Sequence, residues 1–411
     1  MASQDKTASG EPQSLLWTIR GEAYDLSGWQ DQHPGGAYVL ERTRGSDVTA
    51  LFESYHTFAE PARLAATLAR FRVRAASSAE SQASCEWEWG AQPKTTEARR
   101  RVRAYFSTRS PKAPRWVLAY YCAWAAALVG SLCAWQSRGG GAGAAALLGL
   151  AIWFCAGDLC HSGLHYAVLA RPRDNLRLGF ALGWLHMIPA LWFRQHVIGH
   201  HAYPNVEGRD PDLYHFQATA LETRGALGWR LCEDSSWARR WRYGVAVVAV
   251  MTGLGPLLLE SIEYIAGGRY LSPYVVAPCA GAPPARQRLE ALAYWLAVAA
   301  LIVRAAALHG PLVAVLPFAI HGSFYYLFSQ VSHANHASHV TPQPAGVSAV
   351  ACRALRVQQE PRGNFPKRKG EWLEHQLVTS QGDYAYESRF WNMCSNGLNL
   401  QSVHHCFPNV H

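Results

Sequence analysis

Charged side chains are scarce in this sequence of 411 residues. Only 16% of the residues are charged, whereas 49% are hydrophobic, and the chain contains 16 Trp and 18 Tyr. An average soluble domain carries about 25% charged residues. The scarcity of charge therefore argues against an ordinary soluble enzyme and favours long segments that face lipid.

Two other features are missing. The ten cysteines form no Cys-x-x-Cys pair and have no regular spacing, which argues against a disulfide framework and indicates reduced thiols. The N-terminal stretch MASQDKTASGEPQ has no apolar core. Because a secretory signal peptide requires such a core, we expect the first domain to remain in the cytosol.

The net charge of +9 is compatible with two kinds of partner, nucleic acid or a membrane surface. Basic residues beside apolar spans explain the charge more simply, because the cytoplasmic loops of membrane proteins are enriched in Lys and Arg. We therefore expect a membrane as partner and no nucleic acid.

Composition divides the chain into three regions. Residues 14–75 mix polar and apolar side chains, which predicts a small soluble domain. Residues 76–115 predict a linker, in which AASSAESQAS is poor in apolar residues and is followed by the basic juxtamembrane run RRRVR. Residues 116–411 predict a membrane domain.

Four stretches of the membrane domain are apolar enough to cross a bilayer, whose core of about 30 Å needs roughly 20 helical residues. They are residues 116–136, 142–160, 291–308 and 311–331. Only the dipeptide HG separates the last two, which predicts a helical hairpin. A shorter apolar stretch, 245–259, is predicted to be interfacial or re-entrant. With four spans the Arg and Lys clusters share one side of the membrane, as the positive-inside rule favours.

Histidines gather in clusters that four spans place on the cytosolic side, as a histidine-rich cap. The clusters read HSGLH, HVIGHH, QVSHANH and QSVHH, and they contain His161, His165, His196, His200, His201, His333, Gln401, His404 and His405. Residues four apart on a helix share a face, so His161 and His165 are expected to point together. Eight imidazoles exceed the four ligands of one tetrahedral zinc ion. They suit two metal ions, and imidazole is a good ligand for iron.

The clusters lack the Glu-x-x-His pairs of carboxylate-bridged di-iron bundles. We therefore expect a nitrogen-rich site. Asp158, Asp210 and Asp212 have two interpretations that the sequence leaves open: carboxylates that orient the histidine rings, or solvated and capping residues. A metal pair beside an apolar interior suits oxygen chemistry on a lipid substrate.

The N-terminal region offers a second pair of histidines. His33 precedes Pro34-Gly35-Gly36 in YDLSGWQDQHPGG, and His56 lies in LFESYHTF. Two imidazoles on opposite faces of a haem leave no open coordination position, which predicts an electron carrier. The alternative is that His33 is an ordinary turn histidine.

These motifs resemble two known families. YDLSGW, HPGG and SYH make residues 14–75 similar to a small α+β cytochrome b5 domain. HSGLH, HVIGHH and QSVHH make residues 116–411 similar to the membrane fatty acid desaturases, which carry three histidine boxes. The N-terminal domain and the Gln that opens the third box resemble the front-end subgroup. HHAYPNVEGRDPDLYH and GLNLQSVHHCFP resemble its Δ5/Δ4-type members.

The resemblance implies a fold, a reaction and a set of site residues. The expected fold is the b5-like domain followed by an all-α membrane domain with four transmembrane helices. The expected reaction inserts a cis double bond into a polyunsaturated acyl chain, between an existing double bond and the carboxyl end, and consumes O2. His33 and His56 match the axial ligands of haem b. Two non-haem iron ions are implied, with ligands matching His161, His165, His196, His200, His201, His333, His404 and His405.

Further properties follow from the same resemblance. Gln401 stands where many desaturases have His, and His336 competes with His333 for the ligand after the last span. The acyl substrate is a CoA ester or a phospholipid-linked chain, and NADH-cytochrome b5 reductase is the implied electron donor. The implied location is the endoplasmic reticulum membrane, with the b5-like domain and the histidine boxes facing the cytosol.

The sequence departs from the family at two places. Ser162 follows His161, where the first box usually has Asp, and the chain ends with CFPNVH at His411, where relatives usually continue. Histidines without box spacing are not expected to act directly; they are His186, His215, His309, His321, His339 and His375.

Other functions fit the same motifs. A sphingolipid long-chain-base desaturase or an acyl hydroxylase would use the same scaffold and oxidant. A non-catalytic membrane electron carrier that holds haem and metal is the alternative from another class.

Overall fold

The computed structural model describes residues 16–77, 80–81, 87, 89–204, 210, 265–266, 285–333, 370–380, 383, 385 and 387–411. Several sequence expectations lie outside the described residues: the re-entrant stretch 245–259, Asp212, His215, His336 and His339. His333 is described only as the last residue of a helix, without its side chain.

The N-terminal domain is built on a three-stranded antiparallel sheet in the order β1-β2-β3. Its strands are β1 (Trp17–Ile19), β2 (Glu22–Tyr24) and β3 (Arg72–Ala75). Arg20 and Gly21 link the first two strands and both have positive φ, 52° and 76°, as a tight two-residue hairpin turn requires. Trp17 is fully buried, and its indole N–H donates to the carbonyl of Leu40 at 3.0 Å. The expected small α+β unit is therefore present.

Four helical segments stand between the second and third strands. They are η1 (Ser27–Gln32), α1 (Ala37–Thr43), α2 (Thr49–Tyr55) and α3 (Pro61–Ala69). The HPGG motif joins η1 to α1, and both glycines are needed there. A Cβ on Gly35 would lie 2.9 Å from Cε1 of His33, and Gly36 has a φ of 85°.

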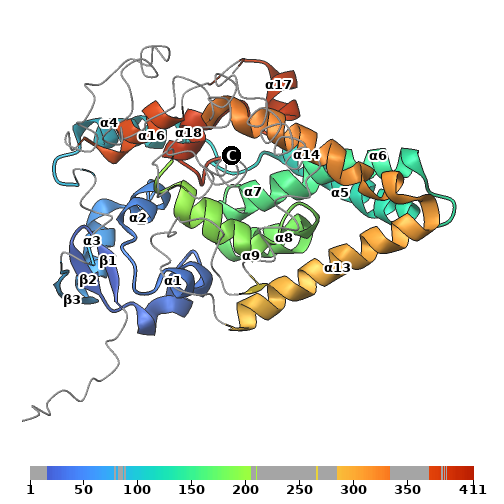
Figure 1. Cartoon of the computed structure of the whole chain (residues 1–411). Coiled ribbons are helices and arrows are strands. Elements are labelled where there is room, and N and C mark those ends of the chain that lie inside the picture. Colours follow the sequence, from blue (N-terminus) through green and yellow to red (C-terminus); the bar gives the residue numbers. More distant parts are fainter. Residues whose placement is uncertain are drawn as a thin grey trace, which may run out of the picture.

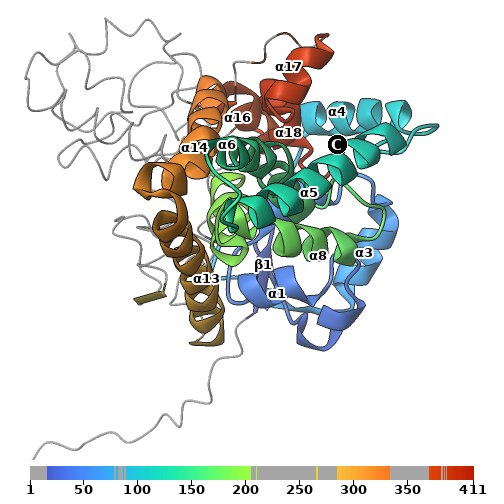
Figure 2. The same cartoon turned by 90° about the vertical axis from the view of Figure 1, so that its right-hand side faces the viewer.

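The basic segment before the membrane domain forms the helix α4 (Pro93–Tyr105), which packs against the N-terminal domain. Arg99 donates at 2.7 Å to the carboxylate of Glu53, which is only 2% exposed and is also bonded by Arg20. Arg103 donates at 2.6 Å to the carbonyl of Thr57. Some of this basic run therefore holds the N-terminal domain in place. In both views α16 (Trp372–Thr379) lies beside α4 (Figure 1, Figure 2).

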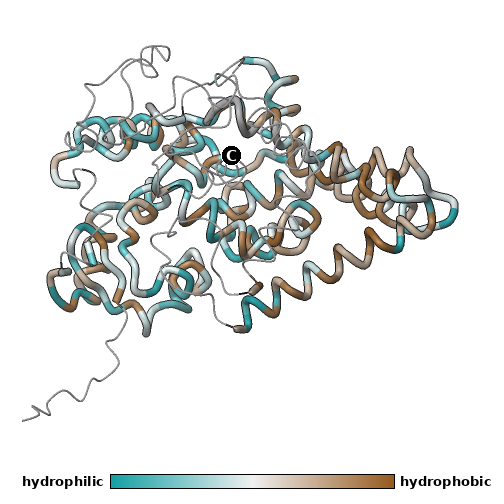
Figure 3. The backbone as a smooth tube through the Cα atoms, in the orientation of Figure 1, coloured by the Kyte–Doolittle hydropathy of each residue, from teal (hydrophilic) through white to brown (hydrophobic). Residues whose placement is uncertain are grey.

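Long apolar helices form the other half of the molecule, where hydrophobic residues concentrate (Figure 3). They are α5 (Arg115–Trp135), α6 (Ala142–Ala151) continued through the π-helix η2 (Ile152–Gly157) into α7 (Asp158–Leu164), α13 (Ala285–His309) and α14 (Pro311–His333). Gly310, with a φ of 87°, turns the chain between the last two, so the predicted hairpin is present.

The number of membrane spans is three to four among the described residues. Three helices are long and apolar enough to cross a bilayer: Arg115–Trp135, Ala142–Leu164 and Ala285–His309. A fourth is reached if the pair Pro172–Leu185 and Pro189–His200, bent by 118°, is one span. The predicted fourth span at 311–331 lies in the continuous helix α14. Among the described residues, however, only Pro311–Tyr325 of this helix is apolar, which is shorter than a membrane span.

Close packing joins α6 to α14. A Cβ on Gly149 would lie 2.7 Å from the carbonyl oxygen of Pro317, so only glycine allows this approach. The buried Trp135 donates its indole N–H to the carbonyl of Val313 at 3.2 Å. This rigid packing fixes the helix that ends in the first histidine cluster.

Candidate metal centre

Three distant segments supply the histidines of one pocket. His161 lies on α7 and His165 immediately follows it, as the continuation of the long apolar helix that begins at Ala142. The second cluster lies on the π-helix η4 (Phe193–His200), which continues α9 (Pro189–Trp192), and His201 follows directly. The third lies on α18 (Gln401–Cys406). We call the following set the histidine pocket: His161, His165, His196, His200, His201, His404 and His405.

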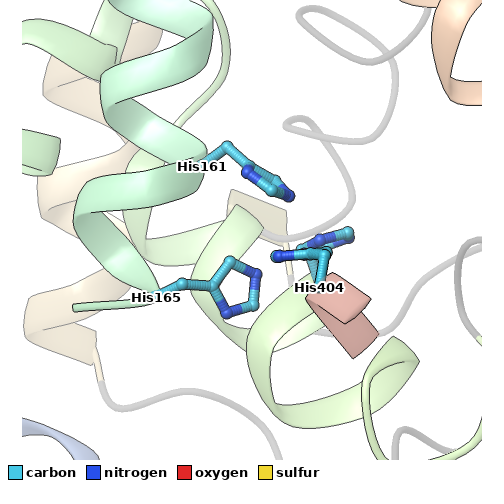
Figure 4. A group of neighbouring side chains, drawn as sticks. His161, His165 and His404 are labelled. Carbon is cyan, nitrogen blue, oxygen red and sulfur yellow. The ribbon is translucent and has the colours of Figure 1, made fainter. Parts of the chain in front are cut away.

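The rings of the pocket converge, as Figure 4 shows for His161, His165 and His404. One ring nitrogen from each of these three and from His196 lies within 4.8 Å of the others, a spacing that allows them to share a metal ion. The ring centroids of His161 and His404 are 4.4 Å apart. The first and third clusters therefore meet, although they lie far apart in the sequence.

The remaining rings extend the cluster to one side. Nε2 of His201 lies 3.2 Å from Nε2 of His196 and 3.1 Å from Nε2 of His404. The ring of His405 stacks on that of His201 at 4.2 Å and also contacts His200 at 4.9 Å. The pocket is thus continuous and holds more imidazoles than one tetrahedral ion uses.

A π-helix sets the spacing of the second cluster. The amide of His201 donates to the carbonyl of His196, five residues earlier, at 3.0 Å. This wider turn places His196 and His201 side by side, whereas an α-helix would align residues three or four apart. Sequence spacing alone does not reveal such a turn.

Three polar side chains fix the outer nitrogens of the rings. Nδ1 of His200 lies 2.9 Å from Oδ1 of Asp210, Nδ1 of His405 lies 3.0 Å from Oε1 of Gln376, and Nδ1 of His165 lies 2.5 Å from the hydroxyl of Tyr55. Such partners set the tautomer and the orientation of metal-binding histidines. Asp210 was among the candidates from the sequence. Gln376 and Tyr55 were missed, because neither stands in a recognisable pattern with a histidine box.

The inner nitrogens fit a metal. Among the described residues, Nε2 of His161, Nε2 of His165 and Nδ1 of His201 are buried and have no hydrogen-bond partner. Buried polar atoms are normally satisfied. Burial, reinforced by neighbouring imidazoles, holds the pKa values of His201 and His404 well below that of ordinary histidine. These rings are therefore neutral, and neutral imidazole is the form that binds metal.

Asp158 bonds no histidine ring in the part of the chain that the structure describes, although the sequence made it a candidate. It is buried, and its carboxylate accepts hydrogen bonds from Ser162 and Tyr121, each at 2.9 Å. The solvated interpretation is also wrong, because the side chain is only 7% exposed. Ser162, the departure in the first box, serves as a partner of this carboxylate one turn earlier.

The other histidines of the sequence have different surroundings. Nδ1 of His186 lies 2.8 Å from Nε2 of His321, and both rings are buried. His309 bonds the carbonyl of Trp135, and His375 bonds the carbonyl of Pro204. Gln401 is buried at the start of α18, one turn before His404 and His405.

The second candidate site lies in the N-terminal domain. The ring centroids of His33 and His56 are 6.1 Å apart. Metal–imidazole bonds of about 2 Å on each side of an iron ion bring two axial rings to roughly this separation. Nδ1 of His33 lies 3.3 Å from the carbonyl of Gly36, and Nδ1 of His56 lies 2.8 Å from that of Phe52. Each ring is therefore held by Nδ1, which leaves Nε2 for a haem iron.

Burial disfavours the charged form of both rings. It lowers the pKa of His33 to about 4, with a further contribution from the nearby His56, and it also lowers the pKa of His56. Both imidazoles are therefore neutral at physiological pH, as axial ligation requires. The residues present fit a haem.

Sequence comparisons agree with this pair of sites. The family model for fatty acid desaturase matches residues 139–411, and that for cytochrome b5-like heme/steroid binding domain matches residues 3–76. The chain therefore belongs to the fatty acid desaturase family and carries an N-terminal cytochrome b5-like domain, hereafter the haem domain. Membership makes it an oxidoreductase of lipid metabolism, which confirms the resemblance found in the sequence.

Curated relatives are similar along nearly the whole chain. The acyl-lipid (7-3)-desaturase of Diacronema lutheri is 26% identical over 100% of this chain and 84% of its own. The acyl-lipid (8-3)-desaturase of Mortierella alpina is 24% identical over 96% of this chain and 84% of its own. The acyl-lipid omega-13 desaturase of Chlamydomonas reinhardtii has the same 24% identity and the same coverage. No solved structure matches the chain significantly.

Proposed function

We propose that this protein is a front-end fatty acid desaturase. It inserts a cis double bond into a polyunsaturated acyl chain, between an existing double bond and the carboxyl end, and it consumes O2. The observation that carries the proposal is the convergence of histidines from three distant segments of the sequence on one pocket. There, buried ring nitrogens of His161, His165 and His201 have no hydrogen-bond partner among the described residues, and the chain also carries the haem domain. Named relatives include acyl-lipid (7-3)- and (8-3)-desaturases and a probable Delta(5) fatty acid desaturase.

The histidine pocket would hold two iron ions, with His333 and Gln401 as further candidate residues. Iron supplied with electrons and O2 gives the oxidant that removes two hydrogen atoms from neighbouring unactivated carbons. The polypeptide contributes the neutral nitrogens, the partners that fix the rings, and a water-excluding wall. The buried ring of Trp192 stacks on His196 at 4.4 Å and also contacts His161, which gives the pocket an apolar side.

The haem domain would supply the electrons. His33 and His56 would hold haem b from both sides, which suits transfer of single electrons without oxygen binding. NADH-cytochrome b5 reductase is the proposed donor to this haem. We assign residues 14–75 to the haem domain, 76–115 to the linker and 116–411 to the desaturase domain. Both sites are proposed to face the cytosol from the endoplasmic reticulum membrane.

The test is expression in a host that lacks this activity and is fed defined polyunsaturated acids. Gas chromatography with mass spectrometry of the fatty acyl esters should show a new double bond on the carboxyl side of an existing one. His161→Ala and His404→Ala should each reduce the product below detection. His309→Ala is the matched control, because His309 bonds the carbonyl of Trp135 outside the pocket, and it should retain the product.

Three outcomes would contradict the proposal. An oxygenated acyl chain without a new double bond would identify a hydroxylase on this scaffold. An unchanged lipid profile on mutation of the box histidines would favour a non-catalytic carrier. A product derived from sphingoid bases in place of acyl chains would identify a long-chain-base desaturase.

A further inference from the structure

The haem domain reaches into the histidine pocket through one side chain. Tyr55 is the last residue of α2 and precedes His56, the candidate haem ligand. Its hydroxyl lies 2.5 Å from Nδ1 of His165, and the two rings are stacked with an interplanar angle of 11°. A single dipeptide of the haem domain therefore touches both candidate cofactor sites.

Contacts to its backbone and to its ring hold Tyr55 in place. Its backbone carbonyl accepts a hydrogen bond from Asn409 at 3.0 Å. Lys112 in turn donates to the carbonyls of Asn409 and Tyr166, each at 2.7 Å. The ring of Tyr166 packs edge-on against that of Tyr55 at 5.9 Å. The phenol therefore has little freedom to leave His165.

The hydrogen bond can run in two directions, and only one of them lets Nε2 of His165 bind a metal ion. A neutral imidazole carries one proton, on Nδ1 or on Nε2. If Nδ1 accepted from Tyr55, the proton would sit on the buried Nε2 and block that nitrogen as a ligand. If Nδ1–H donates to the phenol oxygen, Nε2 keeps a lone pair for the metal.

The oxygen of Tyr55 is thus the acceptor that favours the metal-binding tautomer of His165.

We propose that the haem domain completes the metal centre, with Tyr55 as the positioning residue that fixes the tautomer and orientation of His165. The inference rests on the proposed function, because it assumes that the pocket binds metal. It adds that docking of the haem domain contributes to metal affinity, in addition to supplying electrons.

The experiment measures Co²⁺ binding by the purified full-length chain with haem bound. Equilibrium dialysis against buffered free Co²⁺, with metal counted by mass spectrometry, gives the dissociation constant. Tyr55→Phe removes one oxygen atom and keeps the ring. We expect about 10-fold weaker Co²⁺ binding, the loss usual for a residue that orients a metal ligand. The Soret absorbance of the haem should not change.

Tyr166→Phe is the matched control. Its hydroxyl is buried beside the same ring and has no hydrogen-bond partner among the described residues, so this variant should bind Co²⁺ like the unmodified chain. A double-mutant cycle separates positioning from general destabilisation. In a His165→Ala background, Tyr55→Phe should have no further effect on Co²⁺ affinity.

The outcomes distinguish this inference from the proposed function. Unchanged affinity in Tyr55→Phe, or an equal loss with and without His165, would overturn the inference while the metal centre stands. Absence of Co²⁺ binding in the unmodified chain would overturn the metal centre itself, and the inference with it.

Discussion

The His33–His56 pair, which is the proposed haem site, and the histidine pocket differ in how far their residues are separated along the chain. His33 and His56 lie within one small domain, whose sheet and helices are formed by residues 16–77. The histidine pocket draws on α7, η4 and α18, so that His161 contacts His404. The first site depends on local structure, whereas the second exists only when most of the chain has folded. The two sites should therefore respond differently to damage.

The largest expected effect is the loss of one site without the other. His33→Ala removes a proposed haem ligand, so the Soret absorbance of the haem should disappear. Co²⁺ binding should stay within about twofold of the unmodified chain, because no residue of the pocket contacts His33 and Tyr55 is held independently by Asn409. Absorption spectra and metal analysis of the same sample provide the measurement. Loss of both cofactors would show that the sites are not separable.

A smaller effect is expected at the connection between the two regions. Glu53→Gln leaves Arg99, which is 20% exposed, without its carboxylate partner. Breaking a largely buried ion pair costs about 3 kcal/mol. For a domain of this size, the melting temperature followed by the Soret band should fall by about 10 °C or more.

Glu97→Gln is the control for this change. Glu97 pairs with Arg100 and Arg101 on the exposed face of α4, where ion pairs contribute little. Its melting temperature should therefore match that of the unmodified chain. Equal effects of the two substitutions would show that the Glu53 carboxylate does not hold the haem domain.

The smallest effect is a shift in the acid stability of haem binding. Because the folded chain favours neutral His33, the unfolded chain binds more protons below pH 6.5, and the stability of the haem-free domain falls from there to about pH 4. Protons compete with haem iron for the folded imidazole only near its pKa of about 4. A pH titration of the Soret band should show haem retained at pH 5. Release with a midpoint near 6.5 would contradict the burial argument.

The sequence predicted features that depend on repeated or adjacent residues. Apolar runs predicted the helices at 116–136, 142–160 and 291–308, and the histidine boxes predicted the rings that converge. The hairpin at Gly310 followed from the two-residue gap between apolar runs. Each of these signals lies within one short segment of the sequence, so it can be recognised without knowing the fold.

Features that depend on distant contacts were missed or misassigned. Tyr55 and Gln376 orient histidines that lie 110 and 29 residues away, and nothing in their own neighbourhoods marks them. Asp158, one turn before His161, was a reasonable candidate for a ring partner. The fold instead brings Tyr121 from α5 to its carboxylate, and only tertiary packing decides between these partners.

The geometry of the histidine pocket depends on the wide turns of the π-helix Phe193–His200. Wound as a regular α-helix, the same residues would place His201 about 140° around the helix axis from His196, because five residues span about 500°. The two rings then could not serve one pocket. Natural variants of this segment are therefore expected to keep the wide turn between His196 and His201, whatever non-histidine residues they replace.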